Sequence, residues 1–208
     1  MRTRAVELLG WDSVAHVAKT FLMPALAARY VRAPRSPGYH PVLVAQGLSW
    51  VGDVALNGRG QGRFLAGLTS FLGAHLAYIQ AYRGRSSEGV LATSGRRRVA
   101  TLGALTTTAM AVAAGREERA MAVPVAAYGL TLTTMVTAAA AIDADRGRAA
   151  VLTGASLFML SDSLIGLRTF ILGDEDSVAL ETAVLSTYAA AQWCIGEGMA
   201  GRSVDPRR

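Results

Sequence analysis

Charged side chains are scarce in this chain of 208 residues. Asp, Glu, Lys and Arg make up 17% of it, whereas soluble domains average roughly 25%. So few charges cannot cover the surface of an ordinary water-soluble fold. Hydrophobic residues make up 51% of the chain, and this content excludes intrinsic disorder.

Thiol and imidazole groups are rarer still. Cys194 is the only cysteine, which excludes a disulfide framework, a thiolate metal cluster and a CxxC redox motif. The three histidines form no HxxxH pair, so their spacing does not support a metal site. We therefore expect no metal site, and the acid–base chemistry considered below needs no organic cofactor.

Basic residues give the chain a net charge of +6, which raises the question of nucleic-acid binding. The arginines fall in short clusters between long uncharged runs, for example at residues 83–85 and 96–98, without interleaved aromatic residues. This pattern does not fit a nucleic-acid platform. It is typical of the cytoplasmic loops of membrane proteins.

Seven apolar runs have about the length that a bilayer-spanning helix needs, roughly 17–25 residues. They cover residues 12–31, 41–57, 63–82, 99–114, 120–142, 149–172 and 178–200. None alternates as a membrane strand does, and the alternative of a soluble, alanine-rich bundle is disfavoured because two runs carry no charge at all. The sequence predicts one domain, residues 1–208, an all-α polytopic transmembrane bundle of about seven spans. Pro124 is expected to kink the fifth span.

The orientation follows from the loops between these spans. With seven spans, the loops on the side of the C-terminus hold about twice as many basic residues as those on the other side. Loops rich in Lys and Arg usually lie on the cytoplasmic side of the membrane. We expect an integral protein of the plasma membrane with its C-terminus in the cytoplasm.

Polar side chains inside the spans lie at helical spacing, so that each set shares one helix face. The first span carries His16, Lys19 and Met23; the second Gln46, Trp50, Asp53 and Asn57; the third Phe71, His75, Tyr78 and Tyr82; the sixth Ser161 and Asp162; and the seventh Glu181, Tyr188 and Gln192. Ionisable groups in a membrane usually face the bundle interior and have a function. We therefore expect these faces to share one interior pocket.

Two carboxyl groups in such a pocket suit acid–base chemistry. Burial raises the pKa of a carboxyl and a nearby cation lowers it, so Asp53 and Asp162 can hold different protonation states beside Lys19, the only lysine. The competing interpretation is a structural ion-pair network. His75 alone is equally compatible with packing and with catalysis. Arg168 and Glu197, near span ends, are expected to extend toward the interface.

The ordered set of motifs resembles the YhhN family of membrane proteins. The motifs are Gly52-Asp53, FLAGLTSFLGAHLAY at 64–78, LFMLSDS at 157–163 and YAAAQWCI at 188–195. This family is known as the lysoplasmalogenases, and its members commonly have eight spans and often a Lys-Pro pair where this chain has Lys19 and Thr20. We expect this chain to lack the first of the eight family spans. Without it, the N-terminus would lie outside and the C-terminus in the cytoplasm, which agrees with the orientation expected above.

The resemblance implies hydrolysis of the vinyl ether bond of a lysoplasmalogen, a lysophospholipid-type substrate, to a fatty aldehyde and a glycerophospho-alcohol. It implies catalytic roles for Asp53, Asp162 and His75, and supporting or substrate-binding roles for Lys19, Tyr78, Ser161, Tyr188 and Gln192. Which carboxyl is the acid stays open, as do the headgroup and the oligomeric state.

Two other functions remain compatible with these residues. A proton-coupled transporter would use the same carboxyl groups and His75 as a relay. An acyl-cleaving lysophospholipase would use Ser161 as its nucleophile, although no GxSxG motif surrounds any serine of the spans.

Overall fold

The computed structural model describes residues 20–58, 60–172 and 177–201. These residues form seven α-helices without a strand. The first covers residues 20–31; the others are α2 (Tyr39–Leu56), α3 (Gln61–Arg83), α4 (Ser94–Glu117), α5 (Ala122–Ala141), α6 (Arg148–Leu167) and α7 (Val178–Met199). The all-helical prediction is confirmed.

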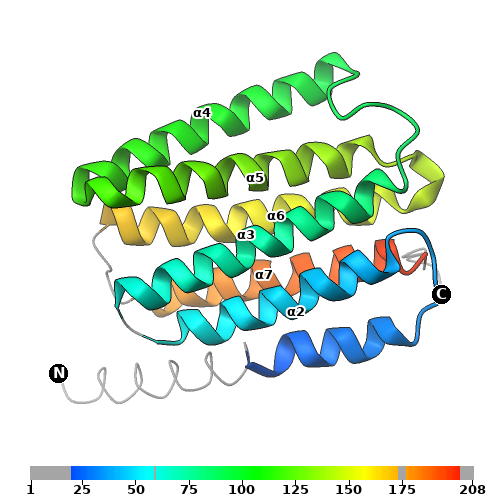
Figure 1. Ribbon diagram of the computed structural model, residues 1–208, viewed down its shortest axis with the longest axis horizontal. Helices are drawn as coiled ribbons and strands as arrows, with labels where there is room; N and C mark the ends of the chain where they lie inside the picture. The colour runs from blue at the N-terminus through cyan, green and yellow to red at the C-terminus, as the bar shows by residue number, and fades with distance from the viewer. Residues whose placement is uncertain (1–19, 59, 173–176, 202–208) are drawn as a thin grey trace.

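The helices run along the long axis of the molecule, with α4 at one edge and the first helix at the other (Figure 1). Helix α2 packs on α3, α6 on α7 and α4 on α5, while α5 joins the halves by packing on both α3 and α6. Site residues from α2, α3, α5, α6 and α7 can therefore meet in the interior of the bundle.

The distribution of side chains is that of a protein surrounded by lipid. Large apolar side chains face outward, including Phe21, Leu102 and Val123, which are 68%, 65% and 75% exposed. The core in turn buries polar groups such as Gln46 and His75. Exposed apolar surface of this extent marks contact with a membrane or another apolar partner.

By length and hydropathy alone, three stretches of the described residues qualify as membrane spans. They are Gln61–Arg83, Arg119–Ala141 and Arg148–Leu172. A helix of 23 residues is about 35 Å long, enough to cross the hydrocarbon core of about 30 Å. The remaining helices pack in the same bundle, although the expected span 12–31 falls partly outside the described residues.

Three details differ from the sequence-based expectations. Helix α4 begins at Ser94 rather than at residue 99, because the Thr93 hydroxyl accepts a hydrogen bond from the Arg96 N–H and starts the helix within the arginine cluster. Pro124 lies in the first turn of α5, where its missing N–H needs no partner, so it starts the helix instead of kinking it. The expected sixth span is an α-helix followed by a π-helix, Arg168–Leu172.

The end of the bundle that carries the α3–α4 connection is held by a buried arginine. Arg85, 5% exposed, donates hydrogen bonds to the carbonyls of Pro37, Arg146, Gly198 and Met199 and to the Ser36 hydroxyl. Burial lowers the pKa of Arg85 from its usual value. Gly198 and Met199 end α7, where carbonyl dipoles favour a positive charge. Arg85 therefore adds side-chain hydrogen bonds to the backbone cap that Ala200 and Gly201 provide at the end of α7.

Candidate functional site

Four of the candidate residues form one buried hydrogen-bond network between α2, α3 and α7. The Tyr188 hydroxyl donates to Oδ2 of Asp53 at 2.8 Å, and the Tyr78 hydroxyl donates to Oε1 of Gln192 at 2.6 Å. Nε2 of Gln192 donates to the Ser49 hydroxyl at 3.2 Å and lies 3.5 Å from the Tyr188 hydroxyl. Each of these side chains is at most 5% exposed. The network fixes Tyr188, and through it the orientation of the Asp53 carboxyl.

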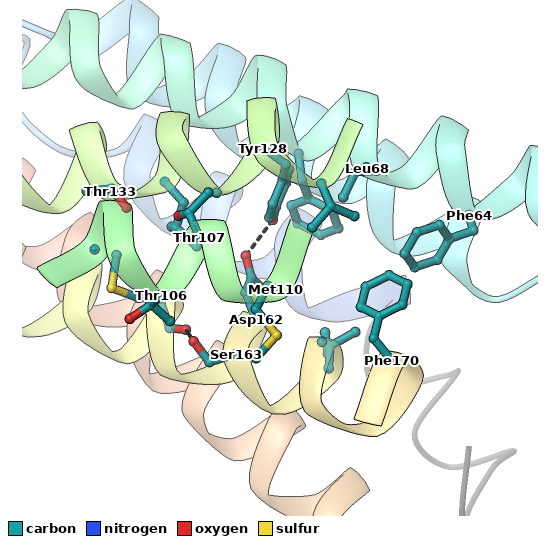
Figure 2. A pocket seen from close by; sticks show the side chains of 18 of the residues that line it. Phe64, Leu68, Thr106, Thr107, Met110, Tyr128, Thr133, Asp162, Ser163 and Phe170 are labelled. Atoms are coloured by element: carbon teal, nitrogen blue, oxygen red, sulfur yellow. Dashed lines mark hydrogen bonds between the residues drawn. The ribbon is translucent and has the colours of Figure 1, made fainter. Parts of the chain in front are cut away.

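The second carboxyl has a different partner, one that sequence patterns missed. The hydroxyl of Tyr128 on α5 donates to Oδ2 of Asp162 on α6 (Figure 2). Tyr128 also interacts electrostatically with Asp53 and with Tyr188. The helix around Tyr128 offers no ionisable neighbour at helical spacing. The one available signal was that Tyr128 is the only tyrosine between residues 83 and 187.

A cluster of aromatic rings connects the two carboxyl groups. The His75 ring lies 5.1 Å from the ring of Tyr128 and 4.9 Å from that of Phe158, and Phe158 lies 5.4 Å from Tyr188. His75 is fully buried, and neither of its ring nitrogens has a hydrogen-bond partner among the described residues. Buried polar groups nearly always have one, so His75 retains an unused capacity for hydrogen bonding beside Tyr128.

Asp162 faces a cavity of about 120 Å³ that lies between α3, α4, α5 and α6 (Figure 2). The wall is mainly apolar: its residues include Phe71, Met110, Leu132 and Met159, with the hydroxyls of Tyr128 and a few Thr and Ser as the other polar groups. Asp162 is the only ionisable carboxyl among the lining residues. Asp53 is not part of this wall and lies in the adjoining core.

The remaining candidates lie in other surroundings. Ser161 donates its hydroxyl proton to the Val184 carbonyl at 3.0 Å and so joins α6 to α7. Trp50 is 41% exposed and donates to the Thr20 carbonyl, so it lies outside the buried face of α2 that carries Gln46 and Asp53. Lys19 and His16 lie outside the described residues.

Two charges expected at the interface are paired between elements. Arg168 contacts Glu181 at 3.1 Å, and Arg29 forms two hydrogen bonds with Glu197, at 2.8 and 3.0 Å. That Arg168 and Glu197 extend toward the interface stays a prediction. Among the described residues no three His, Cys, Asp or Glu side chains come together as metal ligands would.

The sequence of this chain was compared with curated proteins, solved structures and protein-family models. Searches of curated proteins and of solved structures give no significant match. The model of the YhhN family matches residues 14–199, which include every one of the candidate site residues. This match covers most of the chain, and the protein is therefore a member of the YhhN family.

Proposed function

We propose that this protein is a membrane-embedded hydrolase that cleaves the vinyl ether bond of lysoplasmalogens. The observation that carries the proposal is the single carboxyl group, Asp162, in the wall of a mainly apolar cavity between membrane helices. An apolar cavity suits the alkenyl chain, and the carboxyl supplies a proton donor at the same place. Membership of the YhhN family supports this chemistry over other uses of the cavity.

The reaction needs one proton donor and one water molecule. The acid transfers its proton to the alkenyl carbon that is not bonded to oxygen, and the C=C electron pair forms the new C–H bond. The resulting oxocarbenium ion takes up water, which loses a proton to the carboxylate and gives a hemiacetal. Breakdown of the hemiacetal releases a fatty aldehyde and the glycerophospho-alcohol. The charge that develops resembles that of glycoside hydrolysis.

The geometry favours Asp162 as the proton donor, because Asp162 contacts the cavity. Tyr128 holds one carboxyl oxygen of Asp162 and leaves the other for the substrate. Asp53, oriented by Tyr188 in the adjoining core, contributes negative charge that stabilises the oxocarbenium ion. His75 binds the attacking water through its unpaired nitrogens.

Tyr78 and Gln192 support the site from a distance, because they hold Tyr188 in place. In this proposal Lys19 either binds the phosphate of the substrate or alters the pKa of one of the two carboxyl groups. The proposed location is the plasma membrane with the C-terminus in the cytoplasm, on the distribution of arginine in the loops.

The test offers purified protein an alkenyl lysophospholipid and the matched acyl lysophospholipid, and measures aldehyde and fatty acid separately. We expect aldehyde from the alkenyl lipid alone. Asp162→Asn and Asp53→Asn should each lower the rate by at least about 100-fold, the usual range for loss of an acid–base group. Fatty acid release, or aldehyde release that survives both substitutions, would contradict the proposal.

The two alternative functions receive less support from the site. A proton relay would link the two carboxyl groups, whereas Asp53 and Asp162 accept hydrogen bonds from separate tyrosines, Tyr188 and Tyr128. A Ser161 nucleophile needs a base to accept its proton, whereas the hydroxyl is directed at the Val184 carbonyl.

A further inference from the structure

Two aromatic side chains lie at one end of the Asp162 cavity. Phe64 on α3 and Phe170 in the π-helix pack edge to face, with ring centroids 6.2 Å apart and ring planes at 87°. Figure 2 shows both at the same end of the cavity, away from Thr133. A π-helix fits an additional residue into its turn and is frequent at functional sites. Here it carries Phe170 to the cavity wall.

The same two rings also line a second cavity. This outer cavity has a volume of about 210 Å³, and its other walls come from the beginning of α3, the end of α4 and Thr169. Three of its lining residues, Gln61, Glu117 and Glu118, are exposed. Among the residues described, the two cavities share only Phe64 and Phe170, so this pair separates them.

The position of the outer cavity identifies it as the aqueous end. Helix α3 begins at Gln61 and α4 ends at Glu117, so the outer cavity lies where two membrane helices terminate. Carboxylates at Glu117 and Glu118 fit that level better than the hydrocarbon core. The inner cavity, with its apolar wall, lies deeper in the bundle.

The dimensions suit a single-chain lipid that passes between the rings. Asp162 and Thr169 are separated by seven residues of helix, about 10 Å along the axis. An extended glycerophospho headgroup of about ten bonds, each roughly 1.5 Å and staggered, covers a similar length. The inner cavity of about 120 Å³ holds roughly four water-sized groups at about 30 Å³ each, which fits one short chain segment and not two.

We propose that Phe64 and Phe170 form the neck of the substrate site, through which the polar end of the lipid and the water for hydrolysis pass. The headgroup then occupies the outer cavity while the ether bond lies at Asp162. The assignment of the ether bond rests on the proposed function; the separation of the two cavities does not. Phe64 and Phe170 act as access and specificity residues and take no part in proton transfer.

Thiol labelling tests the neck without any reaction. Cys194→Ser removes the only thiol; Ser163→Cys then places one in the inner cavity and Thr169→Cys one in the outer cavity. In nanodiscs, a charged water-soluble methanethiosulfonate should modify the outer thiol readily and the inner one slowly. Phe170→Ala should speed modification of the inner thiol at least 10-fold and leave the outer rate unchanged. Equal inner rates with and without Phe170 would overturn the proposal.

Three controls distinguish a local effect of the Phe170 ring from a general loosening of the fold. Phe170→Leu keeps much of the bulk and should leave the inner rate close to that of the parent. Phe21→Ala truncates a ring that is 68% exposed on the first helix and should have no effect. Thr137→Cys, on α5 and 1% exposed, should stay unmodified in the Phe170→Ala background.

Protection by a saturated 1-alkyl glycerophosphoethanolamine, which has no vinyl ether to hydrolyse, tests the path of the headgroup. We expect it to shield both thiols. Shielding of Ser163→Cys alone would overturn passage through the neck, and shielding of neither would overturn lipid binding at this site. If both are shielded but no aldehyde forms from an alkenyl lipid, the neck stands as part of a lipid-binding site and the proposed reaction fails.

Discussion

Asp162 on α6 receives a hydrogen bond from the hydroxyl of Tyr128 on α5, at the wall of the inner cavity. Neither the helical spacing of polar residues nor the family motifs named Tyr128. The contact nevertheless sets the orientation of the one carboxyl that faces the cavity. Its consequences for the proposed reaction can be measured directly.

Removal of the Tyr128 hydroxyl should slow the reaction. Asp162 becomes a carboxylate as it gives up its proton, and a hydrogen bond to a charged group contributes roughly 1.5–3 kcal/mol. We therefore expect Tyr128→Phe to lower kcat about 10- to 100-fold with little change in KM. The matched control is Tyr82→Phe, because the buried Tyr82 hydroxyl has no hydrogen-bond partner in the part of the chain that the structure describes. Steady-state kinetics of aldehyde release decides; equal kcat values for the two variants would remove Tyr128 from the site.

His75 should matter through its nitrogens and not only through its bulk. His75→Phe keeps an aromatic ring between Tyr128 and Phe158 but cannot bind water, and we expect kcat to fall at least about 10-fold, within the range for positioned polar groups. The melting temperature should change by only a few degrees, since the ring contacts remain. Wild-type turnover in this variant would assign His75 to packing alone.

Arg85 should contribute strongly to stability. Arg85→Gln removes most of the hydrogen bonds to the carbonyls at the end of α7, and loss of about 3 kcal/mol is expected for buried partners of a charged group. Arg83→Gln is the matched control, since Arg83 lies two residues earlier and is exposed. Thermal unfolding in one detergent compares them, and an equal melting temperature for both variants would contradict the role given to Arg85.

Gly154 should be intolerant of any side chain. A Cβ there would lie 2.7 Å from the Ala191 carbonyl oxygen and 2.9 Å from the Ile195 nitrogen, both backbone atoms of α7. Gly154→Ala should destabilise the protein by about 1–3 kcal/mol, as overpacking does. Gly47→Ala, with nothing within 4 Å of the added carbon, should be neutral or stabilising. The same unfolding measurement tests the pair, and equal stabilities would show that α6 can move away from α7.

Helix positions could be predicted closely because apolar runs dominate them. The expected spans 41–57 and 178–200 match α2 and α7 within two residues. The prediction failed at α4, where Arg96 to Arg98 were counted as a loop: charge sets the end of the apolar run, but Thr93 sets the beginning of the helix. The π-helix after α6 follows from tertiary packing and leaves no pattern in the sequence.

The contacts of the candidate site could be predicted only in part. Helical spacing placed Tyr78, Tyr188 and Gln192 on interior faces, and the structure joins them in one network with Asp53. Spacing within one helix cannot say which helices are neighbours. For that reason the partner of Asp162, its place at the cavity and the separation of Asp53 from that cavity emerge only from the packing of α5 on α6.

Helix α7 contacts the surroundings of both proposed catalytic carboxyl groups. It carries Tyr188, which holds Asp53 of α2, and its Val184 carbonyl receives the Ser161 hydroxyl one residue before Asp162. A slide of α7 by a single turn, about 5.4 Å, would therefore release Asp53 and disturb the backbone beside Asp162 together. A compound that binds between α6 and α7 and separates them would therefore inhibit the proposed reaction without entering the cavity.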